Sequence, residues 1–170
     1  FGVPVFLYED SASAEGRRNL ADVRKGEFEG LAARLKAPEW KPDFGPARPH
    51  PTAGAVAVGA RAPLIAYNIN LGTRDIAVAD RIAKAIRHIG GGFRYVKAMG
   101  VELADRGIVQ VSINMTNYRK TPLHRVFECV KSEAERHVVP IVGSEIVGLP
   151  PAAAPFLAAG HYLRLECFSA

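Results

Sequence analysis

The sequence predicts an α+β fold in which two helices cover one face of a four-stranded sheet, and three observations on residues 58–170 support this. Residues 64–71 and 108–115 alternate apolar and polar side chains with the period of two typical of strands. Apolar residues recur at helical spacing after positions 73 and 121. The elements run strand, helix, strand, strand, helix, strand, with strands expected at 64–71, 95–103, 108–115 and 138–149. This order is the split β-α-β, or ferredoxin-like, arrangement.

Both expected helices begin with a recognisable signal. Thr73 is expected to cap the first helix, with Asp75 in its first turn. Thr121 is expected to cap the second, with Pro122 at its first position. The apolar stripes that would face the sheet are Ile76, Ala79, Ala83 and Ile86 in the first helix and Leu123, Val126, Phe127, Val130, Ala134 and His137 in the second. A further helix is expected to begin in PPAAAPFLAAGHYL.

The first part of the chain offers less regular structure. Residues 3–8 predict one strand, 19–35 a helix broken by glycines, and the remainder a long loop. That is too little to bury a core alone, so we expect residues 1–57 to be the C-terminal part of another α/β subdomain and 58–170 to be a second subdomain. The chain opens in a core-type strand without Met, which suggests a fragment or a processed chain.

The composition is that of a globular protein, with 48% hydrophobic and 23% charged residues. No apolar run approaches the roughly 20 residues that a membrane-spanning helix needs. The net charge of +5 favours an anionic partner, either nucleic acid or a small molecule with carboxylates, although a basic surface without a partner is an equal alternative. Cys129 and Cys167 follow no metal-ligand spacing and fit buried thiols in a reducing cytoplasm.

Two features could bind a ligand. The expected strands place Asn68, Asn70, Gln110, Ser112 and Asn114 on the face opposite the helices. Amides and hydroxyls both donate and accept hydrogen bonds, so this face suits a heteroaromatic ring, although a solvated sheet face is the alternative. The second feature is the stretch DFGPARPHPTAG at 43–54, which is either a stiff linker or a shaped loop that contacts a ligand. Within it, His50 is either a surface residue or a ligand contact or general acid.

These residues resemble the glutamate formiminotransferase family, the transferase part of formiminotransferase-cyclodeaminase. The matching stretches are GVPVFLY (2–8), EWKPDFGP (39–46) with the loop that follows to Gly54, YNINL (67–71), QVSINM (110–115) and PIVGSEIVGLPP (140–151). The resemblance implies transfer of the formimino group of N-formimino-L-glutamate to N5 of tetrahydrofolate, in histidine breakdown, with tetrahydrofolate as co-substrate and no metal. It also implies that the chain holds the end of the first subdomain of such a transferase and most of the second.

The resemblance further implies which residues bind folate. These are Gly45, Pro46, Ala47, Arg48, Pro49, His50, Pro51, Thr52, Ala53 and Gly54, with Asn70, Gln110 and Asn114 as candidates from the groove. The middle of the loop, ARPHPTA, departs from the vertebrate form. No catalytic residue carries over, because the family's catalytic histidine precedes GVPVFLY, so this chain alone is expected to be inactive. We expect a homodimer in the cytoplasm, with neither nucleic acid nor a membrane as partner.

Two other functions stay open at this point. A ferredoxin-like fold also suits a binding module for RNA or for a partner protein, and a relative of the transferases could sense folate without catalysis. However, the third expected strand has amides where RNA-binding domains of this topology need stacking aromatic residues.

Overall fold

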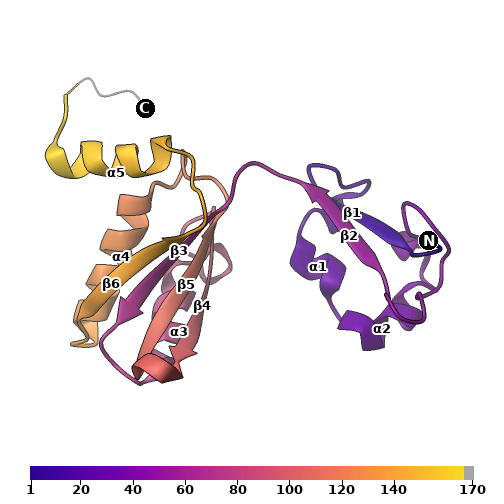
Figure 1. Cartoon of the computed structure of the whole chain (residues 1–170), viewed down its shortest axis with the longest axis horizontal. Coiled ribbons are helices and arrows are strands. Elements are labelled where there is room, and N and C mark those ends of the chain that lie inside the picture. Colours follow the sequence, from indigo (N-terminus) through magenta and orange to yellow (C-terminus); the bar gives the residue numbers. More distant parts are fainter. Residues whose placement is uncertain (167–170) are drawn as a thin grey trace. The chain divides into compact units, whose positions relative to one another are not determined.

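A computed structural model describes residues 1–166 of the chain. The chain divides into two compact units, Phe1–Arg61 and Ala62–Ala170, and each is described here by itself (Figure 1). Cys167, which we expected to be a buried thiol, lies outside the described residues. Cys129 is described as a free, half-buried thiol.

The second unit has the predicted ferredoxin-like architecture. Its four strands form one sheet in the order β4-β5-β3-β6, and every neighbouring pair is antiparallel. These strands are β3 (Ile65–Leu71), β4 (Val96–Leu103), β5 (Ile108–Met115) and β6 (Ile141–Val147). Figure 1 shows α3 (Ile76–Ile86) and α4 (Leu123–Arg136) together on one face of this sheet, and α5 (Ala153–Leu163) beside one end of α4. Two short 3-10 turns, η3 (His88–Gly90) and η4 (Ala104–Arg106), flank β4.

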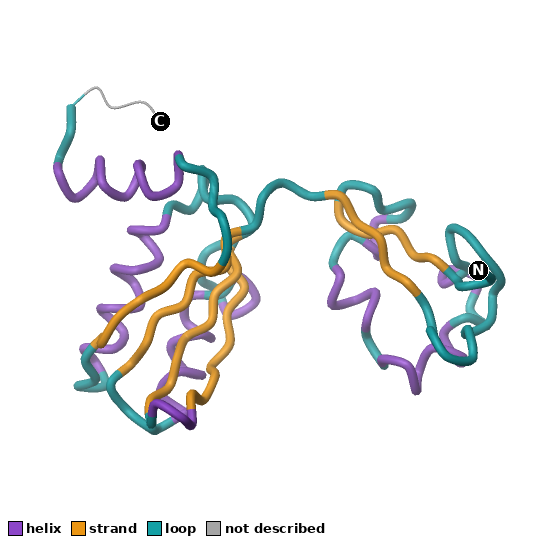
Figure 2. Tube along the Cα trace, in the orientation of Figure 1, coloured by secondary structure: helices purple, strands orange, loops and turns teal. Residues whose placement is uncertain are grey.

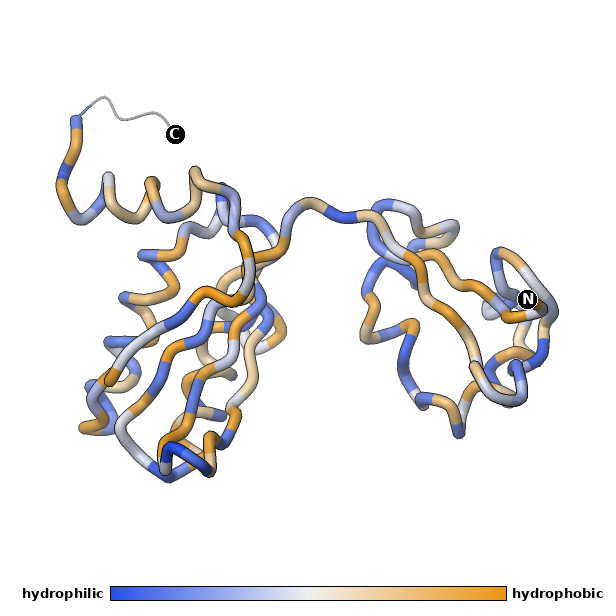
Figure 3. The backbone as a smooth tube through the Cα atoms, viewed as in Figure 1, coloured by the Kyte–Doolittle hydropathy of each residue, from blue (hydrophilic) through white to orange (hydrophobic). Residues whose placement is uncertain are grey.

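The core of the second unit lies between the sheet and the two helices. Because strand side chains alternate between faces, the predicted apolar positions of β3 and β5 all point inward. Ile69 and Val111 are paired across these two strands, and both are fully buried. The inward faces of α3 and α4 complete the core with Ile82 and Val126, which have no exposed surface. Figure 3 shows the corresponding alternation of hydrophobic and hydrophilic residues along the strands.

The helix starts differ from the expectation by one or two residues. Asp75, not Thr73, is the N-cap of α3, and its carboxylate accepts a hydrogen bond from the Ala77 amide at 2.9 Å. Thr73 instead accepts a hydrogen bond from the Asp75 amide at 3.1 Å, so it shapes the turn before the cap. In α4, Pro122 is the cap itself and Leu123 is the first helical residue. His137 ends α4 as a half-exposed C-cap, so it is not the core histidine that its spacing indicated.

The first unit is built around a parallel pair of strands that are far apart in the sequence. Strand β1 (Val5–Glu9) pairs with β2 (Val56–Ala60), and Val5 lies opposite Val56. Between them follow η1 (Glu15–Arg17), α1 (Leu20–Arg24), α2 (Glu27–Arg34) and η2 (Pro38–Trp40). The chain then runs as loop from η2 to β2 (Figure 2).

Strand β2 was not predicted from the sequence. It reads VAVGA, and all five of its residues are exposed. Figure 3 shows it as largely hydrophobic. Such a short segment of small residues has neither polar–apolar alternation nor helical spacing. Its partner strand β1 is about fifty residues earlier in the sequence, so no local pattern indicates β2.

No helix within residues 1–166 is both long enough and apolar enough to cross a membrane.

Candidate functional site

The 43–54 loop begins as an extension of the β1–β2 sheet. The Val5 amide donates to the Phe44 carbonyl at 2.8 Å, and the Asp43 amide donates back to the Val5 carbonyl at 2.9 Å. Gly45 then turns the chain in the left-handed region, at φ +81°. A Cβ atom at this position would lie 2.3 Å from the Val3 carbonyl oxygen, so only glycine fits here. The start of the loop is therefore held to β1 by backbone geometry.

The other end of the loop closes on itself. His50 and Gly54 form an isolated antiparallel bridge, with backbone hydrogen bonds of 2.8 and 3.0 Å. The Nδ1 atom of His50 accepts hydrogen bonds from the amides of Thr52 and Ala53, at 3.3 and 3.1 Å. Gly54 is buried in the left-handed region beside the ring of Phe28. His50 therefore organises the turn with one ring nitrogen, and only its Nε2 atom is left for other contacts.

The middle of the loop is exposed. Ala47, Arg48 and the tip at 51–53 face solvent, between two ends that are fixed to the first unit. A rigid frame with an exposed, cationic middle is the arrangement expected of a binding loop, because little conformational entropy is then lost when a ligand binds.

The amide residues predicted for the open face of the sheet do lie together there. Gln110 of β5 and Asn70 of β3 are directly paired across the strands. The side-chain amide of Gln110 donates to the Asn70 oxygen at 2.8 Å, and each of these residues is only 5% exposed. Ser112 is paired with Asn68 two residues further along the strands, whereas Asn114 is exposed near the strand ends. Asn70 and Gln110 thus already satisfy part of each other's hydrogen-bonding capacity.

A carboxylate belongs to the same cluster, and the sequence analysis missed it. Glu145 of β6 is paired with Asn68 of β3, and its Oε1 atom accepts hydrogen bonds from Asn68 at 3.2 Å and from Gln110 at 2.9 Å. The pairing of β3 with β6 shifts register between Asn70 and Leu71, which leaves Val142 without a direct partner. This irregularity sets which β6 side chains point to the open face. An exposed carboxylate beside three amides can accept hydrogen bonds from a ligand with neighbouring N–H groups.

A second group of titratable residues joins α4 to α5, on the helix side of the second unit. The rings of His124 and His161 stack at 4.0 Å with an interplanar angle of 6°, and the Tyr162 hydroxyl donates to Glu128 at 2.7 Å. Burial, and then the hydrogen bond and charge of Glu128, raise the pKa of Tyr162 to about 12. His124 and Tyr162 border a cavity of about 440 Å³ between α4, α5 and β6.

The stacked pair of His124 and His161 predicts that the stability of the contact between α4 and α5 depends on pH. Burial, followed by the charges of His161 and Arg125, lowers the pKa of His124 against the opposing effect of Glu128. For a histidine, a lowered folded pKa means stability that is present above the ordinary value of about 6.5 and is lost as the pH falls toward the folded value. We therefore expect the amides of α5 to lose hydrogen-exchange protection between pH 7 and pH 5, after correction for the intrinsic exchange rate.

The control for this prediction uses the same residue type elsewhere. His124→Gln should make the protection of α5 nearly independent of pH, whereas His88→Gln, at an exposed position, should leave the dependence unchanged. A pH dependence that survives in His124→Gln would contradict the assignment.

Comparisons with known proteins identify the family of this chain. The family model "Formiminotransferase domain, N-terminal subdomain" matches residues 1–61, and the model "Formiminotransferase domain" matches residues 66–169. The chain belongs to the formiminotransferase family.

Within residues 1–166, no group of three or more His, Cys, Asp or Glu side chains is arranged to hold a metal ion.

Relatives with established names align with nearly the whole chain. The glutamate formimidoyltransferase of Streptococcus pyogenes serotype M1 is 54% identical over 98% of the chain, and that of Thermoplasma acidophilum is 46% identical over 98%. The formimidoyltransferase-cyclodeaminase of Gallus gallus is 45% identical over 97% of the chain. The chain covers 56%, 55% and 31% of these three proteins, in the same order. It therefore spans about half the length of the Streptococcus and Thermoplasma relatives.

Proposed function

We propose that this chain contributes the folate-binding part of a glutamate formimidoyltransferase, which transfers the formimino group of N-formimino-L-glutamate to tetrahydrofolate. The observation that supports this most strongly is the 54% identity to a glutamate formimidoyltransferase over 98% of the chain. Tetrahydrofolate is the proposed co-substrate. In this proposal the first unit is the C-terminal part of the N-terminal subdomain, and the second unit is the C-terminal subdomain.

The 43–54 loop is the proposed contact for folate in the first unit. Its ends are fixed by Gly45 and by the His50–Gly54 bridge, so it presents residues 46–53 in one shape. Arg48 is exposed in this segment. A guanidinium binds carboxylates by paired, charge-assisted hydrogen bonds, and the glutamate moiety of folate is anionic.

The open face of the sheet is the proposed contact in the second unit. A pterin ring presents N–H donors and ring acceptors side by side, and Glu145 with its neighbouring amides offers the complementary groups. Asn114, which is exposed, stays a candidate contact, while the buried pair of Asn70 and Gln110 would act mainly by orienting Glu145. The homodimer and the cytoplasmic location expected from the sequence stay predictions.

Arg48→Gln tests the proposed function at the loop. We expect the dissociation constant of the chain for 5-formyltetrahydrofolate, a stable folate, to rise about tenfold, because one charge-assisted hydrogen bond is lost. The melting temperature should not change, since Arg48 is exposed. Isothermal titration calorimetry and thermal unfolding measure the two quantities.

Arg125→Gln is the matched control, because it removes the same charge from the exposed surface of α4, on the helix-covered side of the sheet. An equal loss of affinity in both variants would indicate general attraction of an anion rather than a loop contact. Absence of folate binding by the unaltered chain, together with tight, salt-sensitive RNA binding, would favour the RNA-binding alternative over the proposed function.

A further inference from the structure

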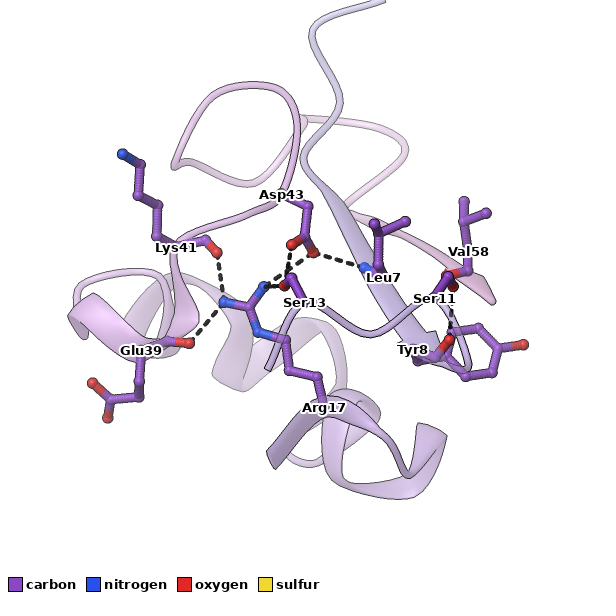
Figure 4. A network of polar contacts seen from close by, with 9 residues as sticks. All are labelled: Leu7, Tyr8, Ser11, Ser13, Arg17, Glu39, Lys41, Asp43 and Val58. Carbon is purple, nitrogen blue, oxygen red and sulfur yellow. Dashed lines mark hydrogen bonds and ion pairs between the residues drawn. The ribbon is translucent and has the colours of Figure 1, made fainter. Parts of the chain in front are cut away.

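A buried arginine lies directly behind the start of the 43–54 loop. Arg17 of η1 is 6% exposed, and its guanidinium carbon lies 5.5 and 5.7 Å from the ring centroids of Phe6 and Trp40, which pack edge to face against each other. One terminal nitrogen donates to the carboxylate of Asp43 at 3.0 Å. Figure 4 shows this guanidinium in the middle of the polar network.

The second terminal nitrogen of Arg17 binds the backbone that leads into the loop. It donates to the carbonyl oxygens of Glu39 at 2.7 Å and Lys41 at 2.6 Å (Figure 4). One side chain thus fixes three points between residues 39 and 43. A planar guanidinium with several donors can do this, whereas the single ammonium of lysine cannot reach the carboxylate and both carbonyls in the same geometry.

Asp43 connects this network to the sheet. Its carboxylate accepts hydrogen bonds from the Leu7 amide of β1 at 2.7 Å, from the Ser13 hydroxyl and from Arg17 (Figure 4). The side chains of Arg17 and Asp43 are only 7% and 9% exposed. Removing a buried charge from water is costly, so replacing such a pair with apolar residues is often neutral or even stabilising. Stability alone is therefore a weak reason for this pair, whereas its geometry fixes a specific loop shape.

We propose that Arg17 and Asp43 are positioning residues that hold the 43–54 loop in its ligand-binding shape without touching the ligand; this inference rests on the proposed folate function. The pair acts on the loop entrance, and Gly45 and the His50–Gly54 bridge transmit that fixed start to the exposed middle. When the pair is broken, the loop samples open shapes, and the ligand binds only the fraction of molecules in which the loop is closed. The apparent affinity is then the affinity of the closed form multiplied by that fraction.

The charge state of Asp43 supports a network that persists under ordinary conditions. Burial alone would raise the pKa of the Asp43 carboxyl, but hydrogen bonds from Ser13 and the Leu7 amide and the charge of Arg17 outweigh it, so this pKa lies below its ordinary value. A lowered carboxyl pKa means stabilisation that is complete above the ordinary value of about 3.9 and is lost as the pH falls through the folded value. The network is therefore intact in any assay near neutral pH.

Arg17→Lys and Asp43→Asn test the inference in the whole 170-residue chain. Hydrogen exchange of the Val5 and Gly54 amides reports loop opening, because these amides donate to the carbonyl groups of Phe44 and His50, which are both in the loop, and not to the altered side chains. Calorimetry measures the affinity for 5-formyltetrahydrofolate. We expect affinity to fall about tenfold, which requires the loop to be open in about nine of ten molecules, so the protection of both amides should be almost completely lost. Saturating ligand should restore the protection.

Arg18→Lys is the matched control, since the adjacent Arg18 forms an exposed ion pair with Glu15, with side chains 58% and 88% exposed. It should change neither quantity. Affinity that is unchanged in both test variants, or reduced without faster exchange of the loop amides, overturns the positioning role. No binding by the unaltered chain would instead overturn the proposed function, and this inference with it. If Asp43→Asn does not fold, Arg17→Lys, which keeps the charge, decides the question by the same two measurements.

Discussion

Ile69→Ala is expected to reduce the stability of the second unit by about 2–5 kcal/mol, the range for removing most of a buried aliphatic side chain. Ile69 lies in β3, which has a partner strand on each side, and it has no exposed surface. Its truncation leaves a cavity that the neighbouring strands cannot close, because their spacing is fixed by hydrogen bonds to both sides. Urea unfolding followed by far-ultraviolet circular dichroism measures the change.

Ile89→Ala is the control for this result. It is chemically the same substitution, but Ile89 is 88% exposed in η3, so the free energy of unfolding should change by less than about 0.5 kcal/mol. If the two variants lost the same stability, the core between β3, β5 and the two helices would not be the one that stabilises the unit.

Gly45→Ala is expected to have the second large effect, on the first unit. Alanine in the left-handed region costs about 1–2 kcal/mol. In addition, the new Cβ atom would lie 2.3 Å from the Val3 carbonyl oxygen, which is backbone and cannot rotate away. The loop entrance must therefore separate from β1. We expect a loss of at least about 2 kcal/mol in the first unit and a large loss of folate affinity.

Trp40 provides the measurement for Gly45→Ala. It is the only tryptophan of the chain and it lies in η2 of the first unit, so its fluorescence during denaturation follows that unit alone. Gly26→Ala is the matched control, because Gly26 has nearly the same φ, +83°, but only an ordinary contact of 3.5 Å to the Gly30 Cα atom. Gly26→Ala should therefore lose only the stability that a left-handed backbone costs an alanine, about 1–2 kcal/mol. Equal losses would show that the close contact with Val3 has no effect.

The sequence was sufficient to predict the second unit, because strands with one buried face alternate and amphipathic helices repeat every three to four residues. The strand Ile108–Met115 was predicted with its observed bounds, and the order of elements was confirmed. The polar face of the sheet followed from the same alternation. Glu145 was missed because its orientation depends on where β6 shifts register against β3, at Val142, and not on alternation within β6 alone.

The first unit could be predicted only in part, because its structure depends on contacts between distant residues. Its sheet joins β1 to β2 across nearly the whole unit, and the backbone groups that Arg17 binds lie more than twenty positions away. Nothing in the residues around Arg17 distinguishes it from an exposed arginine such as Arg18. Gly45 and Gly54 belong to the Pro- and Gly-rich stretch that the sequence marked as a linker or a shaped loop, and the structure adds the physical reason for glycine at both positions, since both have positive φ and close neighbours.

Strand β2 has a consequence for the behaviour of the chain in concentrated solution. Within residues 1–166 it is paired on one side only, with β1, and all five of its residues are exposed. Proteins usually protect such an edge with a lysine, a proline or a bulge, and VAVGA contains none of these. The outer N–H and C=O groups of β2 are therefore available to a further strand, either from another part of the protein or from a second molecule. Self-association through this edge would compete with folding as the concentration rises, opposed by the net charge of +5.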